Sequence, residues 1–231
     1  ELARPPPGCV YMRSRALGPG PRGLHAPLRV ARISAASVSY VSDPFALGPT
    51  LALTVLLAAQ LRERRPRGWL APGLLEVRPS LVAGAGRGCF AATALPSGTV
   101  LGAYPGRLRS AAEYATKLRV VGPHVAEYCW RIGDVAALDP TDGEGRLYEA
   151  PGVPLIEGMP ESLRTGAMAN WCTPTTLALL NEPGPGGDVN VGVAVEGADV
   201  VFSAERDVRR GEELYLDYGQ DYDRSGYGGG A

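Results

Sequence analysis

Side chains able to do chemistry gather near the C-terminal end of the chain. Two acids are followed closely by two tyrosines: Glu212, Glu213, Tyr218 and Tyr222. The surrounding pattern is typical of strand, turn and strand, with an apolar run at 200–203, a glycine at position 211 and a β-prone run at 214–218. In the simplest interpretation this segment is a surface β-hairpin with solvated carboxylates.

A glycine-rich stretch, Gly84-Ala-Gly86-Arg-Gly88, lies upstream. A phosphate-binding loop would be followed by a helix that opens with Lys-Ser/Thr, and a dinucleotide-binding loop would lie in a βαβ unit. Strand-like sequence follows instead, which excludes both. Glycines without Cβ atoms would let a ligand approach the backbone of the loop closely.

Two asparagines flank a Gly/Pro-rich spacer in the sequence Asn181-Glu182-Pro183…Val189-Asn190. A turn between a helix and a strand would explain the glycines and prolines but not the asparagines. The amide of Asn181 offers both a donor and an acceptor to a ligand.

Residues 206–219, Arg-Asp-Val-x-x-Gly-Glu-Glu-Leu-x-x-Asp-Tyr-Gly, resemble the C-terminal signature of SET-domain lysine methyltransferases. Earlier stretches are similar to the same family in the same order: the glycine-rich loop, Tyr104-x-Gly106, Asp139-x-Thr141 and Asn181…Asn190. The resemblance covers about residues 76–222. It departs from the family pattern at Glu182, where histidine is usual, and in the longer spacer before Asn190.

The resemblance implies transfer of a methyl group from S-adenosyl-L-methionine to a lysine side chain, with Tyr218 as the catalytic residue. It implies a cofactor site formed by Arg87, Gly88, Tyr104, Asn181, Glu182 and Tyr222, where Glu182 would act through its backbone. It lines the substrate channel with Tyr104, Leu216 and Tyr218. Because Leu216 lacks the hydroxyl that restricts the product in some members, more than one methyl transfer is expected.

The expected fold class is mainly β with few helices, as a SET-type β-clip domain with knot-like C-terminal threading and a helical N-terminal extension. Strands are predicted at 74–78, 99–106, 127–132, 189–195, 200–203 and 214–218, with a further one after the glycine-rich turn. Helical spacing predicts a helix over 108–121 with Ser110 as N-cap. A short helix is expected near 175–180.

The chain divides into four expected parts. Residues 1–42 form a basic, Arg/Pro-rich leader that is either disordered or a targeting segment. Residues 43–70 form the helical extension, with a helix at about 50–64. Residues 71–222 form the SET-like domain, which contains an insertion at 144–178, and residues 223–231 form a Gly-rich tail. The apolar segment 45–61 is at the short limit for a membrane span and is broken by polar residues, so no membrane association is expected.

Charge and cysteine content limit the partners. Residues 1–70 hold ten Arg and three acids, whereas residues 71–231 hold 13 basic and 21 acidic residues. An acidic body suits a lysine-bearing protein or peptide, of which a histone is one candidate, better than nucleic acid.

The four cysteines and two histidines have no zinc-binding or disulfide spacing, so no metal is expected. Reduced thiols favour an intracellular location, without distinguishing nucleus, plastid or mitochondrion. Nothing in the sequence specifies an oligomeric state.

Two alternatives stay open. The histidine replacement at Glu182 and the insertion would also suit a catalytically inactive SET-like module that binds a peptide or protein. A membrane-tethered β-domain would rest on the apolar segment 45–61.

Overall fold

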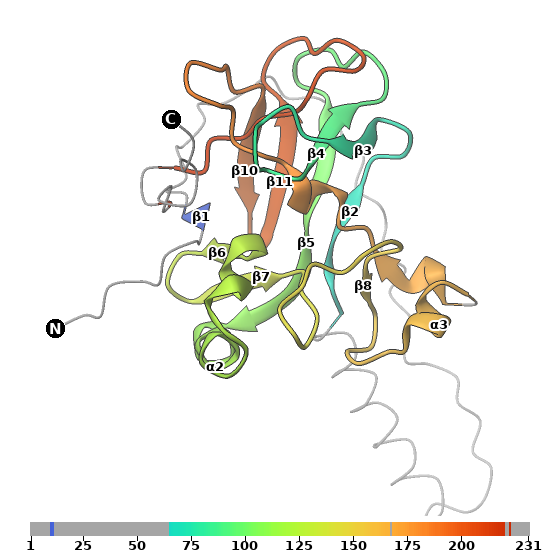
Figure 1. Ribbon diagram of the computed structural model, residues 1–231, viewed down its shortest axis with the longest axis vertical. Coiled ribbons are helices and arrows are strands. Elements are labelled where there is room, and N and C mark those ends of the chain that lie inside the picture. The colour runs from blue at the N-terminus through green and yellow to red at the C-terminus, as the bar shows by residue number, and fades with distance from the viewer. Residues whose placement is uncertain (1–9, 12–64, 167, 220–221, 223–231) are drawn as a thin grey trace, which may run out of the picture. The chain divides into compact units, whose positions relative to one another are not determined.

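The computed structural model describes residues 10–11, 65–166, 168–219 and 222 (Figure 1). The chain separates into two compact units, residues 1–14 with 64–231 and residues 15–63. The second unit, with the predicted helix at 50–64 and the apolar segment 45–61, lies outside the described residues, as does the tail 223–231. Within the described part of the chain, no helix combines the length and the apolar character needed to cross a bilayer.

The described unit is mainly β, which confirms the predicted fold class. One sheet has the strand order β1-β6-β7-β5-β11-β10, and β2 pairs with β5 off this path. Its strands are β1 (Val10–Tyr11), β2 (Arg67–Leu70), β5 (Val100–Ser110), β6 (Trp130–Ile132), β7 (Ala136–Asp139), β10 (Val191–Glu196) and β11 (Asp199–Ala204). Two small sheets pair β3 (Leu75–Pro79) with β4 (Arg87–Ala91), and β8 (Val153–Pro154) with β9 (Cys172–Thr173). The knot-like threading and the helical extension stay predictions.

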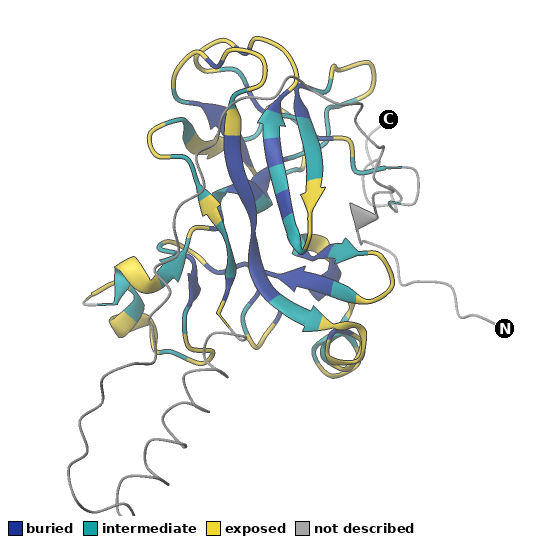
Figure 2. Cartoon of the chain, turned by 180° about the vertical axis from the view of Figure 1, so that it is seen from behind, coloured by how far each residue is buried: buried dark blue, intermediate teal, exposed yellow. Residues whose placement is uncertain are grey.

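The long strand β5 is the centre of the sheet, and most of its length is buried (Figure 2). Its first residues pair with β11, and its last four pair with β7. Between them, Gly106 has a φ of 144°, and a Cβ there would lie 2.7 Å from the backbone nitrogen of Asp139. Glycine therefore lets β7 approach β5 closely where β5 changes partners.

The predicted helix and its Ser110 cap are confirmed as α2 (Ala111–Val121), but the helix begins at 111 rather than 108, because β5 extends to Ser110. The Ser110 hydroxyl accepts from the backbone N–H of Glu113 at 3.3 Å, and the Glu113 carboxylate accepts from the Ser110 N–H at 2.8 Å. This reciprocal pair is a capping box, the sequence signal that made the helix predictable.

The predicted strand at 127–132 was too long. A 3₁₀ helix, η1 (Pro123–Tyr128), occupies its start, and β6 begins only at Trp130. Pro123 suits the first turn of a helix, and the Cys129 N–H donates to the Ala126 carbonyl at 3.2 Å. The remaining short helices are α3 (Glu161–Arg164), η2 (Ala169–Trp171) and η3 (Thr176–Leu179). The last of these confirms the short helix expected near 175–180.

Strands β10 and β11 confirm the strands predicted at 189–195 and 200–203, and they pair as an antiparallel hairpin. The simplest interpretation of the sequence, a surface hairpin in which the run 214–218 pairs with the 200–203 strand, is not what the structure has. Residues after β11 instead turn toward Leu95, which bridges Val208, and the chain then returns beside two earlier segments. There Tyr215 makes a parallel bridge with Asn181, and Leu216 one with Val191.

The main core lies between β5, β11, η3 and the segment 213–218. Its fully buried members include Leu101, Leu138, Phe202, Leu214 and Leu216. Because Leu214 and Leu216 face this core, their neighbours Glu213 and Tyr215 point to the other side of the segment.

Candidate functional site

The segments containing Asn181 and Tyr218 lie side by side. The Leu216 N–H donates to the Asn181 carbonyl at 2.8 Å. Further along, the Tyr218 hydroxyl donates to the Leu180 carbonyl at 2.7 Å, and the Tyr218 N–H donates to the Glu182 carboxylate at 3.2 Å. Residues 36 and 38 apart in sequence are thus held together by hydrogen bonds that each join a backbone group to a side chain, and the hydroxyl of Tyr218 has a fixed direction.

Tyr222 lies next to Tyr218. The two ring centroids are 4.6 Å apart, with the planes inclined by 56°. Both rings are half-buried and pack against the main core. The two tyrosines of the sequence pattern therefore form one aromatic wall.

Asn181 joins this wall to the glycine-rich loop. Its Nδ2 amide donates to the Ser80 hydroxyl at 3.0 Å and to the Arg87 carbonyl at 3.0 Å. Nδ2 also lies 3.2 Å from Oε1 of Glu213. The structure thus brings together the predicted residues Asn181, Glu182, Tyr218 and Tyr222 with the backbone at positions 87 and 88.

Glu213 is the residue that sequence reasoning missed. Its side chain is buried, although the simplest interpretation of the sequence placed it in solvent. Its Oε1 accepts from the Ser80 hydroxyl at 2.6 Å, and its Oε2 accepts from the Leu81 N–H at 2.7 Å and from the Tyr215 hydroxyl at 2.9 Å. The one available signal in the sequence was the alternation with Leu214 and Leu216. If these leucines face the core, Glu213 lies on the opposite face of the segment, where another segment can cover it.

Gly88 has a more specific role than close approach to a ligand. A Cβ at this position would lie 2.9 Å from the carboxyl carbon of Glu213 and 3.2 Å from Nδ2 of Asn181. Glycine is required so that these two side chains can lie against the backbone of β4.

The backbone and the side chain of Arg87 bind different parts of the structure. Its carbonyl belongs to the cluster around Asn181, whereas its guanidinium reaches Glu149 in the insertion, with nitrogen–oxygen distances of 2.8 and 2.9 Å. Both side chains of this pair are largely exposed. The predicted contact between Arg87 and a cofactor would therefore come from the backbone in this arrangement.

Tyr104 and Leu216 lie in the main core rather than in the hydrogen-bonded cluster. The Tyr104 hydroxyl donates to the Tyr128 carbonyl at 2.6 Å, and its ring lies 5.4 Å from Trp130 and 5.9 Å from Phe202. Tyr218 and Tyr222 pack against the core to which Tyr104 and Leu216 belong. Their place in a substrate channel stays a prediction.

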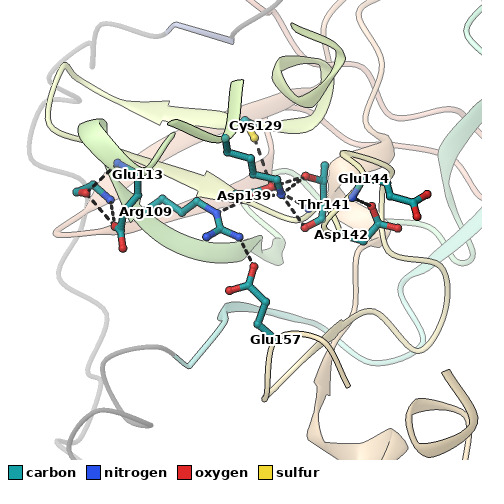
Figure 3. A network of polar contacts seen from close by, with 10 residues as sticks. Arg109, Glu113, Cys129, Asp139, Thr141, Asp142, Glu144 and Glu157 are labelled. Carbon is teal, nitrogen blue, oxygen red and sulfur yellow. Dashed lines mark hydrogen bonds and ion pairs between the residues drawn. The ribbon is translucent and has the colours of Figure 1, made fainter. Parts of the chain in front are cut away.

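The Asp-x-Thr stretch forms a separate polar network (Figure 3). Asp139 is buried and accepts from the Thr141 hydroxyl at 2.6 Å and from Lys117 Nζ at 2.7 Å, and it pairs with Arg109. Arg109 also reaches Glu157 of the insertion at 2.5 Å. Burial raises the pKa of Asp139, but Lys117 and Arg109 outweigh it, so the pKa falls below its ordinary value.

Two further groups show the effect of Glu213. Burial, followed by the charge of Glu213, raises the pKa of the Cys89 thiol to about 12. Burial, followed by the hydrogen bond to Glu213, raises the pKa of Tyr215 to about 12. Within the described part of the chain, no group of His, Cys, Asp and Glu side chains has the geometry to hold a metal ion.

The family model described as SET domain matches residues 86–219, which is more than half of the chain. The chain therefore belongs to the SET domain family. A comparison with curated proteins found no match.

Solved structures similar to this chain include two of polycomb repressive complex 2. One is ctPRC2 in an autoinhibited conformation bound to S-adenosylmethionine, with 18% identity, a TM-score of 0.44, and coverage of 66% of this chain and 16% of that chain. Another is the complex from Chaetomium thermophilum, with 18% identity, a TM-score of 0.45 and the same coverage. This chain thus spans about one sixth of the length of those it matches.

Proposed function

We propose that this protein is an S-adenosyl-L-methionine-dependent protein-lysine N-methyltransferase. The observation that carries the proposal is the junction of Asn181, Tyr218 and the glycine-rich loop, three elements far apart in sequence. SET domains are generally lysine methyltransferases, and these are the elements that the family resemblance assigns to the reaction.

The loop has the features that a bound methyl donor would need. Gly84 and Gly86 have φ values of 81° and 71°, and no atom lies within 4 Å of where a side chain would begin. The backbone at these glycines is open to a ligand, and the Arg87 carbonyl that follows them accepts from the Asn181 amide. The donor would supply an electrophilic methyl group on a sulfonium. Arg87, Gly88, Tyr104, Asn181, Glu182 and Tyr222 are the residues proposed to hold it.

Tyr218 is proposed to orient the reacting groups. Its hydroxyl donates a hydrogen bond to the Leu180 carbonyl, so toward any other group the hydroxyl oxygen acts as an acceptor. That oxygen can accept from polarised methyl hydrogens or from the lysine amine, and so align the amine with the methyl carbon. The amine must be neutral, although an unperturbed lysine has a pKa of about 10.4. Burial and a nearby cation both lower that pKa, so no dedicated base is required.

A lysine-bearing protein or peptide is the proposed substrate, and a histone is one candidate. The excess of acids over bases in residues 71–231 supports attraction to a basic peptide. Leu216 is buried and has no hydroxyl, so products with more than one methyl group are expected.

The test is incubation of the full chain with labelled S-adenosyl-L-methionine and a panel of lysine-bearing proteins. The chain itself gives little background, because its only lysine, Lys117, is nearly buried and ion-paired. Tyr218→Phe should keep donor affinity and stability but slow methylation by about 10²–10³. Labelled lysine with wild-type activity in Tyr218→Phe would remove the tyrosine from the mechanism.

A SET-like binding module without turnover is a second candidate. Glu182 favours it, because its carboxylate, where the family has histidine, is held by the Tyr218 N–H. Calorimetry with S-adenosyl-L-methionine separates the candidates, since a module need not bind the donor. A folded chain that does not bind the donor would favour the module.

A further inference from the structure

We propose that Glu213 is a positioning residue that fixes the glycine-rich loop and Asn181 in the arrangement that receives the methyl donor. This inference rests on the proposed function and deepens it. Glu213 does not reach the reacting atoms itself; it acts through Ser80, Leu81 and Asn181.

The first argument is the way the carboxylate is held. Glu213 is 1% exposed, and the partners of its carboxylate are neutral: two hydroxyls, a backbone N–H and an amide. Among the described residues, no lysine or arginine pairs with it. Burying a carboxylate without a cation is costly, and an apolar residue would fill the same space at lower cost. The hydrogen bonds are therefore the reason for the carboxylate.

The second argument is where those bonds lie on the loop. The Ser80 N–H donates to the Gly86 carbonyl at 2.9 Å, which closes the neck of the loop. Glu213 binds the same neck through the Ser80 hydroxyl and the Leu81 N–H. The opposite end, at Gly84, is left open, since no atom lies within 4 Å of where a side chain would begin. A fixed neck with an open tip presents backbone groups in one arrangement.

The third argument is that one carboxylate links three parts of the site. Oε1 contacts both Ser80 and Asn181, and Asn181 in turn contacts the Arg87 carbonyl. Glu213 also lies five positions before Tyr218 on the same segment. The loop, the asparagine and the tyrosine therefore share one anchor, so a change in Glu213 alters their relative positions.

The experiment measures donor binding by calorimetry on the full chain, with S-adenosyl-L-methionine as the probe. Glu213→Gln should weaken binding of S-adenosyl-L-methionine on the order of 100-fold. The hydrogen bonds to a charged acceptor are lost, and the NH₂ group of the glutamine faces the Leu81 N–H, which is also a hydrogen-bond donor. Ser80→Ala removes one bond at the neck and should weaken binding about five- to tenfold without unfolding the chain. Ser80→Thr keeps the hydroxyl and should restore most of the affinity.

The matched control is Glu212→Gln. Glu212 is the adjacent acid, but it accepts from Arg206, the Arg209 N–H and the Asn190 amide rather than from the loop. Its replacement should leave donor binding unchanged. In turnover assays, Ser80→Ala should raise the KM for the donor and leave kcat at saturating donor near wild type, a division that general destabilisation does not produce.

Hydrogen exchange without donor gives an independent result. In Ser80→Ala and Glu213→Gln, peptides covering 80–86 should exchange faster, whereas those from β10 in Ser80→Ala should not change. If wild type binds the donor but Ser80→Ala binds equally well, or if loop exchange is unchanged, the positioning role is overturned alone. If wild type does not bind the donor, the proposed function fails as well.

Discussion

The protein buries two carboxylates, Asp139 and Glu213, in contrasting ways. Asp139 has two cationic partners, Lys117 and Arg109, and a threonine within its own turn. Glu213 is held by neutral donors from three segments, at residues 80–81, 181 and 215. Both carboxylates are almost fully buried, so the difference lies in their partners and not in their depth.

The difference separates stability from site organisation. A buried charge with cations on regular elements ties α2, β5 and β7 together, and its loss affects the whole unit. A carboxylate that binds a loop through neutral donors contributes less to global stability and more to the shape of that loop. The two should therefore respond differently to the same substitution of acid by amide.

Asp139→Asn should have the largest effect on stability. It removes the carboxylate that Lys117 and Arg109 share and leaves only Arg109 with another anionic partner, Glu157; breaking a buried pair in this way typically costs about 3–5 kcal/mol. Denaturant unfolding at neutral pH measures the loss. Asp134→Asn is the control, because its ion pair with Arg131 is mostly exposed at the acid and should contribute about 0–1 kcal/mol. Equal effects of the two variants would contradict the structural role of Asp139.

The effect of Asp139 should also depend on pH. Its pKa is lowered in the folded chain, so its contribution is fully present above the unfolded pKa of about 3.9 and is lost as pH falls through the folded value. The stability difference between wild type and Asp139→Asn should therefore be constant at neutral pH and shrink below about pH 4. Unfolding free energies measured from pH 7 to acid test this. A difference that widens on acidification would show the opposite sign.

Glu213→Gln should cost less stability than Asp139→Asn, about 1–3 kcal/mol, because hydrogen bonds rather than ion pairs are lost. Its effect on donor binding should be larger than its effect on melting would suggest. Thermal melting and calorimetry on both variants test whether Asp139→Asn has the larger effect on stability and Glu213→Gln the larger effect on donor binding. If Glu213→Gln lowered the free energy of unfolding as much as Asp139→Asn does, both carboxylates would act mainly on global stability.

Much of the fold was predictable because its signals are local. The hairpin of β10 and β11 follows from two apolar runs around a glycine turn, and α2 follows from Ser110 and Glu113 three residues apart. The partners of 214–218 were not predictable from a short β-prone run, since they lie at Asn181 and Val191, far away in sequence. Tyr218 and Asn181 came from a family resemblance. Glu213 was missed because its burial depends on Ser80 and Leu81, which local composition does not reveal.

Two thiols can report on the two carboxylates separately. Cys89 is buried near Glu213, and Cys129 donates to Asp139 across 3.6 Å. Both should resist alkylation in the native chain, since both are buried and the pKa of Cys89 is about 12. Glu213→Gln should speed alkylation of Cys89 about tenfold and that of Cys129 less, by easing local opening. Asp139→Asn should speed both alike, and mass spectrometry of labelled peptides distinguishes the patterns.

The smallest effect is expected at the exposed pair Arg87 and Glu149. Their side chains are 45% and 68% exposed, so the two-pronged contact is screened by water and salt. Glu149→Gln should change unfolding free energy by about 0–1 kcal/mol, and less at high salt. It frees the guanidinium of Arg87, yet the Arg87 carbonyl remains bound to Asn181. Donor affinity should therefore stay near wild type if Arg87 contributes through its backbone. A clear rise in affinity in Glu149→Gln, measured by calorimetry at low and high salt, would instead show that the insertion holds the Arg87 side chain away from the donor.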